Sequence, residues 1–285
     1  MYPAGVAGIA VRHVRVESDV RLRVLESGPP QGPPVVLLHG WAASAYMHRY
    51  AIADLARAGF RAIAVDIKGH GLSDKPTEGD GLYKTAQLLR EVQHLIDDLG
   101  IDRVALVGQS MGGGLALRLA LEQARRVTAL ALVSPVGLSA IPAARIARVV
   151  SPPMLDRFAP HMVPRWLVAR LLRLTYGNPE RVTERDIDEY WAPSQFDQYA
   201  RAMRALVREF DWAPLADAEL RTLRVPTLLV LGTEDRLIRG VVAAARRLPR
   251  ARHLVIEGGG HDVNEEHHGR VDAEIVGFLS SVISA

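Results

Sequence analysis

The sequence predicts an α/β protein with a mostly parallel, doubly wound sheet and a helical cap inserted after the sixth strand. Segments typical of buried strands alternate with segments typical of helices along most of the chain. The alternation stops after residue 135 and resumes near residue 224, and the residues between these points have helical patterns. The chain has 285 residues, of which 48% are hydrophobic, so it can bury a large core.

The first elements expected are a hairpin and a buried strand. Residues 11–17 and 20–26 are β-rich runs on either side of Ser18-Asp19, which indicates a hairpin. A Gly/Pro cluster follows, and residues 35–38 are then uniformly apolar. A run without polar alternation is typical of a parallel strand that is covered on both faces.

From there, strands and helices alternate. Strands are expected at 61–66, 103–107 and 127–133, and helices at 44–58, 82–99 and 112–123. Helices that connect successive strands in this way produce parallel pairs with right-handed crossovers.

The alternation is interrupted once, by a helical insertion. Helices separated by prolines are expected at 143–150, 165–176, 179–190 and 196–210. Strands then return at 227–231 and 253–256, with helices at 240–248 and 270–283. We therefore expect one core domain, formed by residues 1–135 and 224–285, and a cap formed by residues 136–223. Long insertions after a sheet strand often cover a site.

The composition argues against several classes of protein. No stretch approaches ~18 consecutive apolar residues, so no membrane-spanning helix is expected. The apolar run at residues 6–11 is short and has no positively charged segment before it, unlike a signal peptide. The chain has no cysteine, which excludes a disulfide framework, a thiol nucleophile and a thiolate metal site, and which fits a cytoplasmic location.

The charge pattern does not indicate a nucleic-acid partner, and the expected partner is a small-molecule substrate. The net charge is only +3, and the basic residues are spread along the chain without a dense block. The sequence leaves the oligomeric state open, and a homo-oligomer is compatible with it.

The strongest functional signal is the segment GQSMG at residues 108–112, between an expected strand and an expected helix. A serine on such a sharp turn takes strained backbone angles. The residues two before and two after it must be small, and Gly108 and Gly112 meet this requirement. A glycine-rich helix start that holds a phosphate is the alternative, but neither the dinucleotide-binding pattern nor the P-loop pattern is present. We therefore predict that Ser110 is a nucleophile.

A serine hydroxyl needs a base, and His261 is the best placed of the ten histidines. It follows three glycines after the last expected strand, and loops at the carboxyl ends of parallel strands share one edge of the sheet. His253 lies inside that strand, and His267 and His268 fall at the start of the last helix. A metal cluster formed by His261, Glu265, His267 and His268 is an alternative, but the H-E-x-x-H spacing is absent. We expect neither a metal nor a cofactor.

The base in turn needs a carboxylate that fixes its tautomer, and we predict that Asp235 supplies it. The loop after the strand at 227–231 carries Glu234 and Asp235, so both acids reach the edge of the sheet where His261 is expected. Glu234 is the second choice. Plain surface charges are the alternative for both acids.

Acyl chemistry also needs N–H donors for the developing oxyanion. One expected donor is the backbone N–H of Met111, at the start of the helix that follows the nucleophile. The other is the backbone N–H of Trp41, because Gly40 permits the turn that would direct it. The indole of Trp41 and the ring of His39 are interpreted as structural or pocket-lining groups.

Together these motifs resemble those of the α/β-hydrolase superfamily, over nearly the whole chain. The matching segments are residues 39–41 (HGW), 66–74 (DIKGHGLSD), 108–113 (GQSMGG), 232–235 (GTED) and 260–261 (GH). The resemblance implies nucleophile, acid and base at Ser110, Asp235 and His261, and an oxyanion hole at Trp41 and Met111. Family members with aspartate in place of the serine are epoxide hydrolases or haloalkane dehalogenases, so a serine argues against both. The loop after residue 40 also differs from the Gly-Pro-Gly continuation typical of C–C hydrolases of ring-cleavage products.

The expected function is a carboxylesterase that acts on small to medium, largely apolar substrates through an acyl-enzyme. Apolar and aromatic residues of the cap are candidate pocket walls: Met154, Phe158, Met162, Trp166, Trp191, Phe196 and Met203. Packing within the cap is the alternative for each, because amphipathic helices bury such residues anyway. A lactonase, a C–C hydrolase, an acyltransferase and a non-catalytic ligand receptor remain open as other functions.

Overall fold

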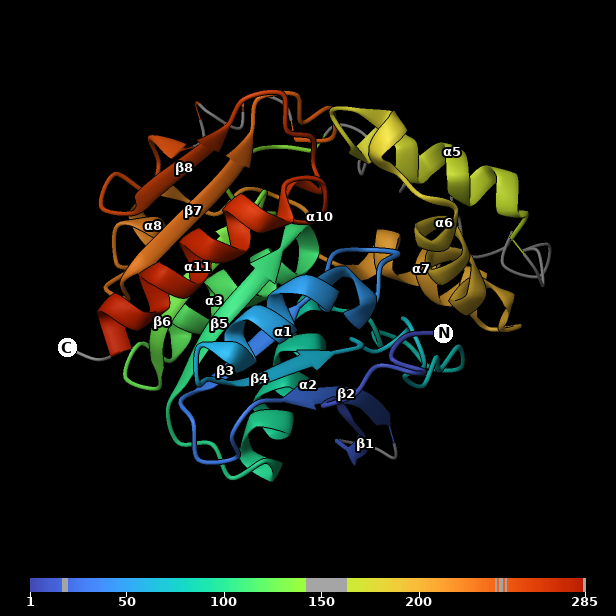
Figure 1. Ribbon diagram of the computed structural model, residues 1–285, viewed down its shortest axis with the longest axis horizontal. Helices are drawn as coiled ribbons and strands as arrows, with labels where there is room; N and C mark the ends of the chain where they lie inside the picture. Colours follow the sequence, from blue (N-terminus) through green and yellow to red (C-terminus); the bar gives the residue numbers. More distant parts are fainter. Residues whose placement is uncertain (17–19, 142–162, 239, 241–242, 244, 284–285) are drawn as a thin grey trace.

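An eight-stranded sheet with the order β1-β2-β4-β3-β5-β6-β7-β8 forms the centre of the molecule (Figure 1). The computed structural model describes residues 1–16, 20–141, 163–238, 240, 243 and 245–283. The strands are β1 (Ala10–Arg15), β2 (Arg21–Ser27), β3 (Pro34–Leu38), β4 (Arg61–Val65), β5 (Val104–Gln109), β6 (Val127–Val133), β7 (Thr227–Gly232) and β8 (Arg252–Ile256). The β1–β2 and β2–β4 pairs are antiparallel, and the other pairs are parallel. The predicted mostly parallel sheet and its opening hairpin are thus confirmed.

Helices cover both faces of the sheet because its central strands are apolar on both sides. In β3, Val35 and Leu37 join the core on one face, while Val36 and Leu38 join the core on the other. The covering helices are α1 (Arg49–Arg57), α2 (Thr85–Asp98), α3 (Ser110–Glu122) and α11 (His268–Ile283). Helices α1 and α11 cover the first face, and α2 and α3 cover the second (Figure 1). The uniform apolar run in the sequence reflects this burial on both sides.

All the regular elements in the described part of the chain between β6 and β7 are helices. They are α5 (Arg165–Thr175), η4 (Pro179–Arg181), α6 (Glu184–Trp191), η5 (Ala192–Gln195), α7 (Tyr199–Glu209) and α8 (Asp217–Leu220). Helices α5 and α6 share a small apolar cluster of their own, built from Ala169, Leu172, Tyr176, Val182 and Ile187. In Figure 1, α5, α6 and α7 lie beyond the arrowheads of the central strands, whereas α8 lies near β7. A helical cap after the sixth strand is therefore confirmed, and its bounds at residues 136 and 223 stay a prediction.

Several expected helices differ in detail from the structure. The single helix expected at 179–190 is divided into η4 and α6, because Thr183 caps α6: its side chain accepts the Asp186 N–H, and the Asp186 carboxylate accepts the Thr183 N–H. The helix expected at 44–58 begins as the 3₁₀ turn η2 (Ala45–His48) and continues as α1. The helix expected at 143–150 lies outside the described residues, and that expected at 240–248 is described only in part. Within the described ranges, no helix is long and apolar enough to cross a membrane.

Candidate active site

The predicted nucleophile lies on a strained turn between β5 and α3. Ser110 is the first residue of α3 and has a φ of 49°, in the left-handed region that non-glycine residues rarely adopt. A Cβ atom added at Gly108 would lie 2.6 Å from the Gly112 carbonyl oxygen, and one added at Gly112 would lie 2.3 Å from the Leu38 carbonyl oxygen. Larger residues at these two positions would therefore clash with the backbone, so the turn requires glycine on both sides of the serine.

A hydrogen-bonded acid–base pair lies at the carboxyl ends of β7 and β8. Nδ1 of His261 donates to Oδ2 of Asp235 over 2.9 Å. The other oxygen of Asp235 accepts the backbone N–H groups of Leu237 and Ile238, both at 2.9 Å. Glu234, the second choice for the acid, is exposed. The pairing leaves Nε2 of His261 as the ring nitrogen that is free to serve a nucleophile.

Both members of this pair have shifted pKa values. Burial alone would raise the pKa of Asp235, but the His261 ring and the two backbone donors outweigh burial and lower it. Burial alone would lower the pKa of His261, but the Asp235 carboxylate outweighs burial and raises it above 6.5. The carboxylate is thus held ionised, and the imidazole is made a stronger base.

The residue before Ser110, Gln109, links the nucleophile turn to the loop that carries His261. Nε2 of Gln109 donates to the His261 carbonyl at 3.3 Å and to Oδ1 of Asp262 at 3.0 Å. Ser110 itself is buried, with 8% of its surface exposed. Among the described residues, no hydrogen bond joins the Ser110 hydroxyl to the His261 ring, so the structure links the Gln109 side chain to the His261 backbone without closing the contact between nucleophile and base. Such contacts commonly tighten only when substrate binds.

The two expected oxyanion donors lie on either side of the serine. Met111 is the second residue of α3, and the first N–H groups of a helix have no partner inside it. The loop that carries Trp41 passes close to the nucleophile, since a Cβ atom added at Gly40 would lie 3.2 Å from Cβ of Ser110. This proximity is compatible with both assignments, which remain predictions.

Side chains in the same loop have structural hydrogen bonds. Nδ1 of His39 donates to the Gly40 carbonyl at 2.7 Å, and Nε2 accepts the Ile67 N–H at 3.0 Å. Both ring nitrogens are therefore occupied, and burial lowers the pKa of His39, so this ring is neutral and is not a second base. The indole of Trp41 donates to the Met203 carbonyl in α7 at 3.3 Å and so links the core to the cap.

The candidate pocket residues occupy different environments. Met154, Phe158 and Met162 lie outside the described residues. Met203 is buried in the main core cluster, whereas Trp166 is 66% exposed.

The two remaining candidates, Trp191 and Phe196, have different packing partners. The Trp191 indole donates to the Val163 carbonyl at 2.9 Å, which is packing within the cap. The Phe196 ring lies 4.6 Å from Nζ of Lys75 in the core, so it lies at the boundary between cap and core.

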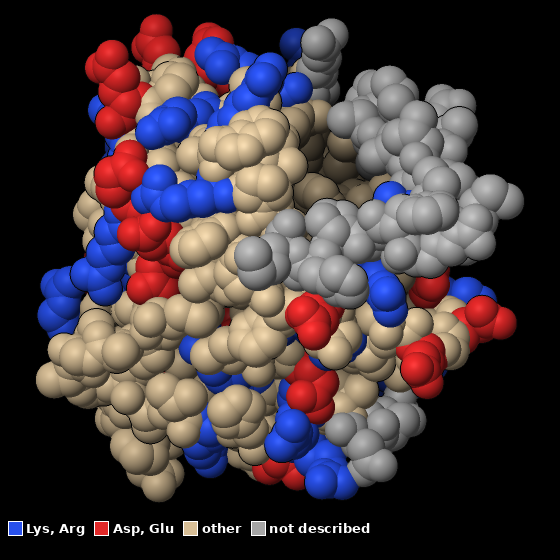
Figure 2. All heavy atoms as spheres, turned by 90° about the vertical axis from the view of Figure 1, so that its right-hand side faces the viewer, with Lys and Arg blue, Asp and Glu red and all other residues tan. Residues whose placement is uncertain are grey.

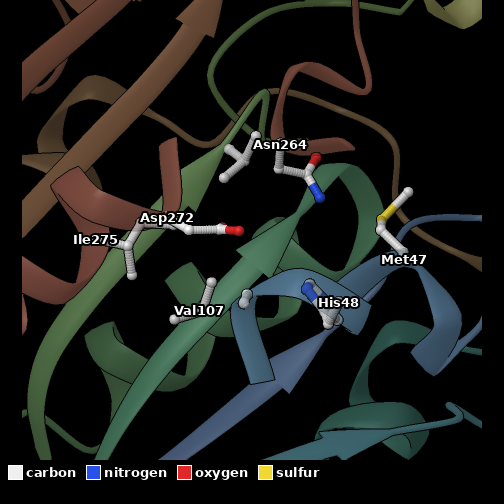
Figure 3. A pocket seen from close by; sticks show the side chains of 8 residues that line it. Met47, His48, Val107, Asn264, Asp272 and Ile275 are labelled. Carbon is white, nitrogen blue, oxygen red and sulfur yellow. The ribbon is translucent and has the colours of Figure 1, made fainter. Parts of the chain in front are cut away.

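A small cavity lies beneath the site, between α1, the sheet and α11 (Figure 3). Its volume is about 10 Å³, and His48, Asn264 and Asp272 line it together with apolar side chains. A volume of this size holds about one water molecule, so the cavity is too small for an organic substrate.

Sequence reasoning missed a group of buried acids that directly follows His261. Asp262, Glu265 and Glu266 are all buried, and burial raises the pKa of Asp262 and raises that of Glu265 to about 7. Their presence in a short acidic run was the available signal, but it suggested only a metal cluster. Within the described part of the chain, no group of three or more His, Cys, Asp or Glu side chains is arranged to hold a metal.

These acids attach the cap to the loop that carries His261. The Glu266 carboxylate accepts the N–H groups of Gly260, Gly177 and Asn178 at 2.8, 3.0 and 2.7 Å. Residues 177 and 178 lie just after the end of α5 in the cap, and Gly260 lies in the loop that carries His261. One carboxylate therefore joins the cap to the catalytic loop.

A second buried acid makes the neighbouring attachment. Arg49 of α1 bonds Glu265, which follows the catalytic loop, and also Asp186 of the cap helix α6. The hydroxyl of Tyr190, also in α6, donates to Glu265 at 2.5 Å. On the face shown in Figure 2, the basic and acidic side chains of the described residues are interspersed.

Known proteins with similar sequences or structures share the fold but differ in the bond they act on. The chain is 28% identical to epoxide hydrolase A of Mycobacterium tuberculosis, over 93% of this chain and 96% of the relative. It is 26% identical to a haloalkane dehalogenase of Psychrobacter cryohalolentis, over 92% and 88% of the two chains. The solved structure of a 2-hydroxy-6-oxo-6-phenylhexa-2,4-dienoate hydrolase from Rhodococcus is 23% identical, and it matches with a TM-score of 0.79 over 95% of this chain and 99% of the other.

The family follows from a match that spans most of the molecule. Residues 33–268 match the family model described as the alpha/beta hydrolase fold, which covers the strands from β3 to β8 and all three predicted triad positions. The chain therefore belongs to the α/β-hydrolase family, and it is a hydrolase.

Proposed function

We propose that this hydrolase is a serine carboxylesterase that cleaves small to medium, largely apolar esters through an acyl-enzyme. The observation that carries the proposal is the 2.9 Å bond from His261 to the buried Asp235, beside a serine with a φ of 49°. A base oriented by a carboxylate next to a strained serine is the arrangement that nucleophilic acyl transfer requires.

In the first step, Ser110 Oγ attacks the ester carbonyl carbon while Nε2 of His261 takes the hydroxyl proton. The backbone N–H groups of Trp41 and Met111 bind the oxyanion that forms on the carbonyl oxygen. The tetrahedral intermediate collapses, the C–O bond to the alcohol breaks, and His261 returns the proton to the departing alkoxide. Asp235 stabilises the imidazolium throughout and keeps its own charge.

In the second step, water replaces the alcohol. His261 takes a proton from the water as the water oxygen attacks the acyl carbon. The acyl–oxygen bond to Ser110 then breaks, and the proton passes to Oγ. The products are a carboxylic acid and the free enzyme.

The serine supports carbonyl substrates over the substrates named for two of the relatives. Attack of a serine on an epoxide or a haloalkane carbon would give an ether, which has no carbonyl for water to attack. Turnover on those substrates requires a carboxylate nucleophile, whose ester can be hydrolysed. Residue 110 therefore favours an acyl substrate, although lactones and C–C bonds next to a carbonyl would use the same groups.

A fluorophosphonate probe tests the nucleophile directly. We expect wild-type protein to be labelled and Ser110→Ala not to be labelled. Absence of labelling in folded wild type would contradict the proposal and favour a ligand receptor on this scaffold.

A substrate panel tests the bond. We expect p-nitrophenyl esters of short and medium acyl chains to be turned over faster than simple lactones, epoxides or a vinylogous diketone with a cleavable C–C bond. Preference for one of the latter three, or for highly charged acyl groups, would replace the esterase assignment. Product analysis with added alcohol distinguishes hydrolysis from acyl transfer.

A further inference from the structure

The backbone of the predicted base is held by the cap. Thr175, the last residue of α5, uses its carbonyl oxygen to accept the N–H of His261 at 2.6 Å and the N–H of Asp262 at 3.1 Å. The polypeptide segment that carries the imidazole therefore depends for its position on a residue of the inserted helices.

The Asp262 side chain extends this link to the nucleophile turn. Its Oδ1 accepts from Nε2 of Gln109 at 3.0 Å, and its Oδ2 lies 2.5 Å from Oγ1 of Thr175. The same Gln109 nitrogen reaches the His261 carbonyl. Asp262, at 4% exposure, thus lies between the cap on one side and the residue that precedes Ser110 on the other.

The protons in this network can be counted. Oγ1 of Thr175 lies 2.7 Å from the Leu172 carbonyl and 2.5 Å from the Asp262 carboxyl, yet a hydroxyl has only one proton to donate. If Asp262 is neutral, its O–H donates to Thr175, and the threonine hydroxyl donates to Leu172. Its other oxygen then accepts from Gln109, and every contact is satisfied. An ionised Asp262 would leave one of the two short contacts of Thr175 without a proton.

Burial also favours the neutral acid. Burial raises the pKa of Asp262, the His261 ring and the Thr175 hydroxyl lower it without reversing the shift, and the charges of Asp235 and Glu266 add to the effect of burial. Glu265 lies on the short helix α10 (Val263–Glu266), which directly follows Asp262. Arg49 bonds Glu265 rather than Asp262, so its positive charge does not pair with Asp262. Another ionised acid beside the Asp235–His261 pair would add to this repulsion.

We propose that Asp262, as a neutral acid, is a positioning residue that connects the cap at Thr175 to the nucleophile turn at Gln109 and so fixes the loop that carries His261 relative to that turn. This inference rests on the proposed function, because it assumes that His261 is the base. In this proposal, residues of both the core and the cap determine the position of the base.

The test uses four variants and one substrate, a p-nitrophenyl ester. Asp262→Asn preserves the network, since the amide N–H donates to Thr175 and the amide oxygen accepts from Gln109. Asp262→Leu removes both bonds, and Thr175→Val removes the hydroxyl alone. Glu257→Gln is the matched control, because it changes an exposed acid in the same loop.

We expect Asp262→Asn and Glu257→Gln to keep kcat within about threefold of wild type. Asp262→Leu should lower kcat by about 10–100-fold with little change in KM, and Thr175→Val by about tenfold, because small displacements of a catalytic group are costly. The rate of fluorophosphonate labelling of Ser110 should fall by the same factors. Circular dichroism and thermal melting establish that each variant is folded.

Two results would overturn the inference. Loss of kcat in Asp262→Asn equal to that in Asp262→Leu would show that the charge is needed, and full activity in folded Asp262→Leu would show that the bridge is not. If Asp262→Leu does not fold, the contrast between Asp262→Asn and Thr175→Val decides, since a neutral bridge requires the first to be active and the second impaired. Failure of wild type itself to react with the fluorophosphonate would instead reject the proposed function.

Discussion

At the scale of single residues, two neighbouring acids differ in environment although the sequence places them side by side. Asp235 is buried and bonds His261, while Glu234 directs its side chain to solvent and uses its backbone N–H to bond the Gly259 carbonyl. The first position can fix the tautomer of the imidazole, and the second cannot reach it.

This contrast gives the first prediction. Asp235→Asn should lower kcat by about 10⁴-fold, because the amide favours the wrong tautomer of His261. Glu234→Gln should leave kcat within about twofold. Steady-state kinetics with a p-nitrophenyl ester measure both, and a large loss in Glu234→Gln with an active Asp235→Asn would reverse the assignment.

The residues that sequence could identify are those whose type is dictated by local geometry. Gly108 and Gly112 are required by the backbone beside Ser110, and the order of strands fixes where Asp235 and His261 emerge. Asp262 could not be assigned in this way. In the sequence it is one of several polar residues after a histidine, and its burial results from contacts with a segment almost ninety positions away.

At the scale of elements, the junction between the cap and the catalytic loop was the least predictable part. The central strands were recognisable because each is a short, mostly apolar run, and residues 127–133 have the predicted bounds. The cap helices were recognisable by their periodicity. Their docking was not, because it uses polar groups such as Glu266 and Asp186, which in most sequences lie on the surface.

The Glu266 carboxylate should therefore matter to stability. Glu266→Ala would leave the buried Gly260 N–H and the partly buried N–H groups of Gly177 and Asn178 without their acceptor, and we expect it to lower the free energy of unfolding by about 2–4 kcal/mol. Glu266→Gln should cost less, because the amide keeps one acceptor oxygen.

Urea denaturation of both variants measures these changes. Glu257→Gln again provides the control, since its side chain is exposed in the same loop. Equal stability of Glu266→Ala and wild type would show that solvent or rearranged groups satisfy the three donors, and that the carboxylate does not hold the cap.

At the scale of the whole molecule, several buried groups are protonated more readily in the folded state than in the unfolded chain. Burial, assisted by the charge of Asp54, raises the pKa of Asp272 to about 8, against the opposing effect of Arg49. Burial raises the pKa of Glu265 to about 7, and the pKa of His261 is also raised. All three raised pKa values make the fold less stable as the pH rises. The lowered pKa of Asp235 has the opposite effect, and it matters only in the acid range, where the fold loses stability as the pH falls.

Asp272 supplies the last prediction, because its carboxyl group lines the small cavity beside His48 and Asn264 (Figure 3). Between its unfolded pKa near 4 and its folded pKa of about 8, the folded protein binds a proton that the unfolded chain releases, so stability falls as pH rises through this window. From about pH 5.5 to about pH 8.5, Asp272 should remove up to about 3 kcal/mol from the free energy of unfolding.

Asp272→Asn, which resembles the protonated acid, should flatten this dependence and be more stable than wild type at the higher pH. The exposed Asp98→Asn is the control and should change nothing. Denaturation curves at the two pH values measure the difference, and a pH dependence in Asp272→Asn as steep as that of wild type would mean that Asp272 is already ionised in the fold.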